Sequence, residues 1–204
     1  MFKPRTIVVV VAMALASSAV AASSASAAGW MVGGTNLTGS EGIALGTIVD
    51  EPFVLSGGGS TITCTGVDIE NGELFGVNKD SETLVFLGCS ISGPPCTIKN
   101  SRITTFPLLS ESTLEGTLAV STLFKPESGT VFTNIELEGL ECPESLLPVK
   151  GTAKVLSPTG QDERTLQLLS AKTGKGELIL GSEEASLKGS TLVEVESHKP
   201  WSLL

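Results

Sequence analysis

The chain has 204 residues, with 13 Lys and Arg against 22 Asp and Glu, which gives a formal net charge of −9 at pH 7. So acidic a surface repels phosphate backbones and anionic membrane surfaces, and we exclude nucleic acid as a partner. The surplus of acids is typical of a protein kept in solution outside the cell, and calcium binding is the functional alternative.

The chain begins with the three parts of a secretory signal. Two cations precede an apolar run from 7 to 16, and small residues then continue to position 28. A signal peptidase accepts small side chains before the cut, so we expect cleavage after Ala27 or Ala28. The apolar run is shorter than the about 20 residues that span a bilayer, and no later run reaches that length. We therefore expect a secreted or cell-envelope protein, with no stable membrane insertion after cleavage.

Cleavage leaves residues 29–204 as a single domain. The signal carries Lys3 and Arg5 and no acid, so its removal moves the formal charge from −9 to −11. A chain of this length buries about 70% of its unfolded surface, which is enough for a hydrophobic core. No linker long enough to separate two domains is present.

Four cysteines remain after cleavage, namely Cys64, Cys89, Cys96 and Cys142. An even number in an exported chain indicates two disulfides, and the sequence leaves all three pairings open. We prefer Cys89–Cys96, across a turn-forming stretch, with Cys64–Cys142. A zinc site is not expected, because the one histidine, His198, is far from every cysteine in the sequence.

Short alternating runs bounded by turn residues follow, which is typical of strands. Pro107 ends one of them, since proline cannot donate to a central ladder. The first predicted strands are 43–49, 61–64, 73–77, 83–87 and 102–106.

The clearest alternation lies in the runs 113–120 and 131–137. In the second run, Val131, Thr133, Ile135 and Leu137 share one side. A Lys-Pro-Glu-Ser-Gly turn at 125–129 separates the two runs, and together they predict a hairpin.

A second hairpin is predicted from the runs 165–169 and 177–180, which flank a glycine-containing turn at 171–176. A helix over 161–170 is the alternative that we weigh below a strand. The last predicted strand is 190–196, where Leu192 alternates with Val193 and Val195.

About a dozen short strands at near-regular spacing indicate an all-β fold, as an antiparallel sandwich or barrel. Helix signals are weak almost everywhere else. Six phenylalanines lie in strand-like runs and are expected in the core: Phe53, Phe75, Phe86, Phe106, Phe124 and Phe132.

Motifs for catalysis, cofactors and metals are missing from the sequence. His198 lies close to the end of the chain, and no G-x-S-x-G elbow is present. The glycine-rich stretch 57–60 lacks the lysine of a phosphate loop and is interpreted as a turn. The acidic stretch 68–73 does not match an EF-hand loop and is interpreted as a polar turn between two strands. We assign no catalytic, cofactor or metal residue and expect no cofactor.

The cysteine layout resembles that of secreted bacterial β-rich proteins with a signal peptide, four cysteines and no assigned activity. The marks are Thr63-Cys64, the run Phe86-Leu87-Gly88-Cys89, Cys96 after a gap of six residues, and Glu141-Cys142. The resemblance covers most of the mature chain and transfers no functional residue.

Three functions follow, and an enzyme is the least favoured of them. The first is a non-catalytic extracellular or envelope-associated protein with a structural or binding role. The second is a ligand-binding β-barrel for a small apolar molecule. The third is a hydrolase using two carboxylates, as glycosidases do, although the chain has few aromatic residues to stack on sugars. The partner is left open.

Overall fold

The computed structural model describes residues 29–46, 51–92, 95–116, 119–140, 142, 145–173 and 177–203. The predicted signal peptide, with Ala27 and Ala28, lies outside these residues. The described chain forms strands, with one 3-10 turn, η1 (Lys99–Ser101), and no α-helix. All strand pairs are antiparallel, which confirms the prediction of a single all-β domain.

Eight strands form a closed ring, which we call the main barrel. Each strand pairs with the next barrel strand along the chain, and the last strand pairs with both its predecessor and the first, which closes the ring. Between the two predicted architectures, this closure selects the barrel. The eight strands are β3 (Ser40–Gly46), β6 (Gly66–Phe75), β7 (Lys79–Leu87), β11 (Leu108–Glu115), β12 (Ala119–Pro126), β15 (Ala153–Ser157), β16 (Gln167–Lys172) and β18 (Glu183–Val195).

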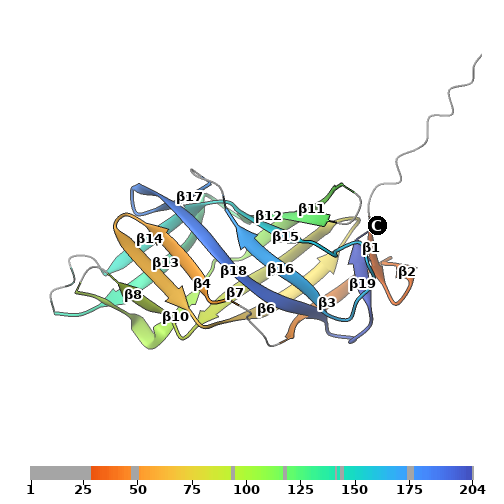
Figure 1. The fold of residues 1–204 in the computed structure, drawn as a ribbon, viewed down its shortest axis with the longest axis horizontal. Coiled ribbons are helices and arrows are strands. Elements are labelled where there is room, and N and C mark those ends of the chain that lie inside the picture. The colour runs from red at the N-terminus through yellow and green to blue at the C-terminus, as the bar shows by residue number, and fades with distance from the viewer. Residues whose placement is uncertain are drawn as a thin grey trace, which may run out of the picture.

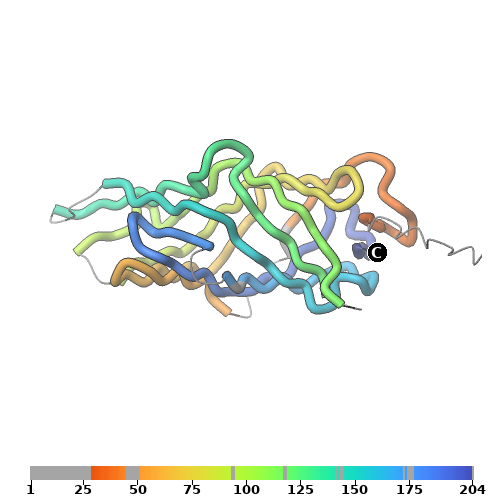
Figure 2. The backbone as a smooth tube through the Cα atoms, turned by 90° about the horizontal axis from the view of Figure 1, so that it is seen from above, coloured from red at the N-terminus to blue at the C-terminus, as the bar shows by residue number. Residues whose placement is uncertain are grey.

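The connections between barrel strands carry eight further strands, which we call the second lobe. They pair in the order β8-β5-β4-β18-β17-β14-β13-β9, and β10 pairs with β7. The first half of β18 is therefore a wall of the second lobe, and its second half is a wall of the main barrel (Figures 1 and 2). The strands are β4 (Phe53–Gly57), β5 (Ser60–Cys64), β8 (Ser90–Ser92), β9 (Thr97–Ile98), β10 (Arg102–Thr104), β13 (Val131–Glu138), β14 (Leu146–Gly151) and β17 (Leu178–Leu180).

A small terminal sheet lies at the end of the main barrel away from the second lobe (Figure 1). It consists of β1 (Trp30–Val32), β2 (Thr35–Asn36) and β19 (Trp201–Leu203), with β1 in the middle. Backbone hydrogen bonds from Trp30 N to Val77 O and from Leu203 N to Gly160 O tie the sheet to the barrel. Both ends of the described chain thus meet at one end of the molecule.

The four cysteines form two disulfides as predicted, but the preferred pairing is wrong. The bonds are Cys64–Cys89 and Cys96–Cys142. The cause is strand register, because Thr63 of β5 lies opposite Ser90 of β8 and this brings the next residues, Cys64 and Cys89, together. Nearness in sequence favoured the short loop between Cys89 and Cys96, and long-range pairing of strands overrides it.

The predicted hairpin of 113–120 with 131–137 is also wrong. The first run is two strands, because Gly116 has a φ of 74° and starts a turn between β11 and β12. The actual hairpin is β11 with β12, whereas β13 pairs with β14 and β9. The alternation predicted in β13 is confirmed for Ile135 and Leu137, and a bulge near its start buries both Phe132 and Thr133.

The second predicted hairpin fails for a similar reason. Its two strands, β16 and β17, both pair with β18 and not with each other. Part of the predicted turn, 174–176, lies outside the described residues. No helix forms between 161 and 170, because residues 161–166 make turns and β16 follows. The predicted last strand is the end of β18, with Val193 and Val195 buried.

Two interpretations of polar stretches have different outcomes. The acidic stretch 68–73 is part of β6, not a turn, and a bulge between Glu70 and Glu73 interrupts it. The glycine-rich stretch does form a turn. Gly58 and Gly59 have φ of 57° and 74°, as a two-residue hairpin loop between β4 and β5 requires.

The buried apolar residues form two clusters. One surrounds the terminal sheet and contains Trp30, Val195 and Leu203, and the larger one fills the second lobe and the adjoining part of the barrel. Four of the six phenylalanines expected in the core are buried. Phe75 is half-buried, and Phe106 is 45% exposed because it lies in the loop between β10 and β11.

Candidate functional site

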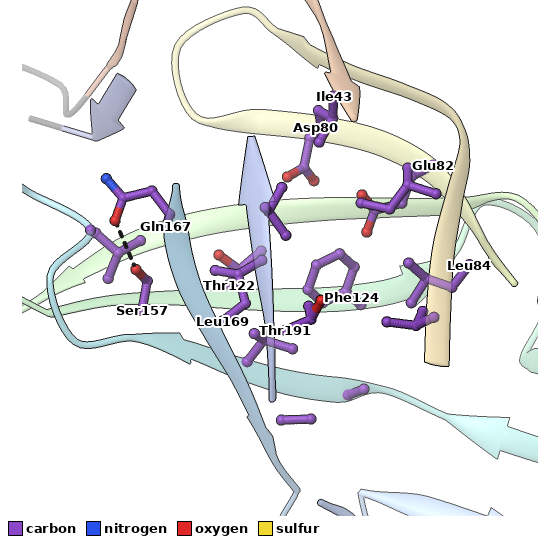
Figure 3. A pocket seen from close by; sticks show the side chains of 18 of the residues that line it. Ile43, Asp80, Glu82, Leu84, Thr122, Phe124, Ser157, Gln167, Leu169 and Thr191 are labelled. Carbon is purple, nitrogen blue, oxygen red and sulfur yellow. Dashed lines mark hydrogen bonds between the residues drawn. The ribbon is translucent and has the colours of Figure 1, made fainter. Parts of the chain in front are cut away.

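The interior of the main barrel contains a cavity of about 80 Å³ between the two apolar clusters. Side chains from all eight barrel strands except β11 line it. Most of them are apolar, such as Ile43, Leu84, Phe124, Leu169 and Val193. Figure 3 shows several of these side chains around the space. The fold thus holds a mainly apolar hollow inside the ring of barrel strands.

Two carboxyl groups project into this apolar hollow, from Asp80 and Glu82 of β7. Successive residues of a strand face opposite sides, so Asp80, Glu82, Leu84 and Phe86 all face inward. The exposed fraction is 6% for Asp80 and 5% for Glu82. Acids so deeply buried are rare unless they are paired with a cation.

Burial changes the acidity of both groups. Desolvation raises the pKa of Asp80 from 3.8 to about 7. Desolvation and then the nearby charge of Asp80 raise the pKa of Glu82 well above its ordinary value of 4.5. Both effects favour the neutral acid, so the two sites do not ionise together at neutral pH in the empty cavity.

The Asp80 carboxyl is also incompletely hydrogen-bonded. Its Oδ1 is buried and has no hydrogen-bond partner in the described part of the chain. Across the sheet, Asp80 lies opposite Ser110 of β11 and Leu74 of β6. The buried Ser110 Oγ likewise has no hydrogen-bond partner among the described residues. Strongly shifted and unsatisfied groups in a cavity mark a candidate binding site.

Other polar side chains of the barrel interior are satisfied within the fold, except that the Trp201 Nε1 at one end of the cavity also has no partner among the described residues. Thr122 Oγ1 and Ser112 Oγ are 2.7 Å apart, and one hydroxyl donates to the other. The Ser157 hydroxyl donates to Gln167 Oε1 at 3.5 Å (Figure 3). Asp80 is therefore distinguished from these neighbours by its free oxygen.

Gln167 connects the cavity wall to the terminal sheet. Its side chain is 1% exposed, and its Nε2 donates to the carbonyl of Trp201 at 2.7 Å and to that of Asp162 at 2.8 Å. Trp201 packs against Trp30 with ring centroids 5.9 Å apart. Trp30 Nε1 donates to the carbonyl of Lys79, the residue before Asp80. The two tryptophans thus close the cavity at this end.

The residues singled out in the sequence lie elsewhere. His198 is exposed, and its Nδ1 lies 3.0 Å from Glu194 Oε2. Cys64 lines a second cavity of about 40 Å³, which lies in the second lobe. Its lining is apolar except for one threonine, Thr133. None of the four cysteines lines the barrel cavity.

Sequence reasoning missed Asp80 and Glu82. A signal was present, because the two acids alternate in step with Leu84 and Phe86, and period-two patterning would have placed all four on one face. We predicted only the run 83–87 as strand, whereas β7 starts at Lys79 and includes both acids.

A larger hollow of about 210 Å³ lies on the surface near η1. Its two cations already have partners, since Lys99 pairs with Glu136 and Arg102 pairs with Glu70. In the described residues, no group of three or more metal-ligating side chains lies together, and no helix is long and apolar enough to cross a bilayer.

No family model matches the chain, and no curated protein or solved structure matches it. The barrel cavity and its two acids are therefore the features of this chain that bear on its function.

Proposed function

We propose that this chain is an exported, non-catalytic binding protein that encloses a small, mainly apolar molecule in its main barrel. The observation that carries the proposal is the cavity itself, which lies inside a closed ring of strands with apolar walls. Protein interiors are normally packed as densely as organic crystals, and voids larger than a water molecule are few. A ligand gives such a void a role.

Export is supported by the disulfides. Two disulfides tie the second lobe, and such bonds persist in oxidising surroundings outside the cytosol. The basic and apolar start of the sequence supports the same address.

The cavity volume sets the size of the ligand. An apolar cavity of about 150 Å³ holds benzene, with its six carbon atoms. The barrel cavity is about 80 Å³, so the ligand that fits without rearrangement is smaller than benzene.

The hydrolase alternative has less support. Asp80 and Glu82 are a pair of carboxyls, as glycosidases use, but such a pair must flank a glycosidic bond with room for water. A hexose has more atoms than benzene and exceeds the cavity of about 80 Å³. A purely structural role gives no reason for the cavity.

The proposal is tested by titrating the oxidised, mature protein with short neutral probes such as 1-butanol. Binding is followed by amide chemical shifts of the cavity residues in NMR spectra. We expect saturable shifts at Leu84, Phe124 and Val193, which line the cavity, and none at the exposed Leu140. If no short probe moves the cavity signals, the proposed function is wrong.

A cavity-filling variant gives the control. Ala171 lines the cavity, and Ala171→Leu adds three carbons to that space. We expect it to weaken binding by roughly tenfold or more, since the ligand loses its volume. The matched control is Ala44→Leu on β3. Ala44 follows the cavity-lining Ile43, so its side chain leaves the other face of the strand, and we expect wild-type affinity.

A further inference from the structure

We propose that the ligand of the barrel cavity is a small primary amine, bound as its ammonium by the carboxyl groups of Asp80 and Glu82. This inference rests on the proposed function and names the chemical class of its ligand. The ammonium nitrogen lies at the two acids, and the short alkyl body contacts the apolar wall opposite.

The two acids are placed to share one cation. They are two residues apart on β7, so their Cα atoms are about 6.6 Å apart and their side chains leave the same face of the strand. Figure 3 shows both carboxyl groups directed into one space, with Thr122 and Phe124 of β12 on its other side. An ammonium group has three donors, enough for both carboxyls and a hydroxyl.

The fold itself supplies no described cation to these acids. On β11, Ser110 lies opposite Asp80 and Leu108 lies opposite Glu82. On β6, Leu74 lies opposite Asp80. The side chains that line the cavity include no lysine, arginine or histidine, and their only titratable groups are the two acids. Lys79 belongs to the opposite face of β7 and is exposed.

The unused acceptor points to a donor from outside the chain. Asp80 is 6% exposed, and its Oδ1 has no hydrogen-bond partner among the described residues. A buried polar atom without a partner is costly, and the cost falls when a ligand supplies the donor. A neutral apolar ligand would leave this oxygen unsatisfied, whereas an ammonium satisfies it and provides the counter-charge.

The apolar wall selects the rest of the ligand. Leu84, Phe124 and Leu169 line the cavity beside the acids. An aromatic ring facing the acids also favours a cation, through attraction to its electron-rich face. With the cavity volume of about 80 Å³, this describes an alkylamine of the size of isobutylamine.

Binding is coupled to protons. Burial raises the pKa of Asp80 to about 7 and that of Glu82 well above its usual value. The two carboxyl groups of the empty cavity therefore carry bound proton near neutral pH. The incoming ammonium stabilises the carboxylates, so a proton passes from the acids to the solvent as the amine binds. Affinity for the amine therefore rises with pH.

The experiment compares two probes of nearly equal shape, isobutylamine and isobutanol, by calorimetric titration of the oxidised mature protein at pH 8 and pH 5. At pH 8 we expect the amine to bind at least about tenfold more tightly than the alcohol, because charge-assisted hydrogen bonds replace neutral ones. That preference falls by roughly tenfold or more at pH 5, where the acids stay protonated. Titrations in buffers of different ionisation enthalpy show proton release at neutral pH.

Two variants assign the effect to the acids. Asp80→Asn combined with Glu82→Gln keeps the shape of the cavity, and we expect equal affinity for amine and alcohol. Glu111→Gln is the matched control, because Glu111 is an exposed acid on β11 opposite Lys79. It keeps the wild-type preference.

The outcomes separate this inference from the proposed function. Equal binding of both probes by the wild type at pH 8 overturns the ammonium site and leaves the apolar binding function standing. Binding of neither probe overturns both. A preference for the amine that survives in the double variant also overturns the ammonium site. The wild-type comparison decides even where the double variant does not fold.

Discussion

The main barrel and the second lobe share a strand and an antiparallel architecture, but their interiors differ in chemistry. The interior of the second lobe is apolar, with a cavity of about 40 Å³, and two disulfides tie its loops. The main barrel has twice that cavity volume and holds Asp80, Glu82 and Gln167 among its apolar side chains. The second lobe is built as a stable support, whereas the barrel accepts buried polar groups that lower stability and suit a binding site.

The largest expected effect is the loss of the disulfides. They join residues 46 apart, at Cys96 and Cys142, and 25 apart, at Cys64 and Cys89. In the chain-entropy treatment these loops contribute about 4 and about 3.5 kcal/mol to the free energy of unfolding. We expect replacement of each pair by alanines to lower the unfolding free energy in urea by amounts of this order.

Hydrogen exchange sharpens the comparison of the two lobes. In the variant without disulfides, we expect amide protection to fall more at Ile135 of the second lobe than at Val193 of the barrel. A reducing agent should lower the amide protection of the wild type and leave that of the variant with four alanines unchanged. An equal loss of protection in both lobes would contradict the division of roles.

The next effect is the dependence of stability on pH. The pKa of Asp80 is higher in the folded protein, about 7, than its ordinary value of 3.8, so the folded state binds the proton more tightly. Below pH 4, the protonated Asp80 makes its full contribution to the free energy of unfolding. As pH rises from 4 to 7, this contribution falls by about 4 kcal/mol. Glu82 acts in the same direction.

Urea titrations at several pH values test this dependence. The double variant Asp80→Asn with Glu82→Gln should show a smaller fall in unfolding free energy between pH 4 and pH 7. At pH 8 it should unfold at a higher urea concentration than the wild type. Glu111→Gln, on the exposed face, should keep the wild-type slope. An unchanged slope in the double variant would show that the fall in stability arises elsewhere.

A smaller effect is expected at the junction of barrel and terminal sheet. Gln167→Leu removes the donor to the carbonyls of Asp162 and Trp201, and the Trp201 carbonyl keeps the backbone N–H of Arg164 as its donor. We expect a loss of about 2 kcal/mol in thermal or urea unfolding, with a change in tryptophan fluorescence at Trp201. Ser92→Ala, which removes an exposed hydrogen bond of β8, is the control and should cost little. A loss no larger than that of the control would mean that Gln167 does not hold the terminal sheet.

Local pattern was enough to predict the fold class, the disulfide count and several strands. Alternation placed Ile135 with Leu137 on one side of a strand and Val193 with Val195 on one side of another, and the structure buries both pairs. The sequence could not predict which strands pair with each other. Nothing near Cys64 or Cys89 shows that β5 pairs with β8, and that register alone decides the disulfide.

The candidate site was missed for a different physical reason. Asp80 and Glu82 have charged side chains, and hydrophobic patterning assigns charged residues to the outside. Their inward position follows from the parity of β7, where Leu84 and Phe86 set which face is buried. Gly116 illustrates the opposite error, since its turn between β11 and β12 was taken for the interior of a strand.

Because the two lobes share strand β18, they are expected to evolve as one unit. Gly189, between its two halves, lies so close to Phe53 of β4 that a side chain at this position would meet the ring at less than 3 Å. Neither lobe has a wall of its own to replace this strand, so neither can be lost, duplicated or exchanged by recombination as a separate module. Relatives of this chain are expected to inherit both lobes or neither, and to vary in the loops that β18 does not touch.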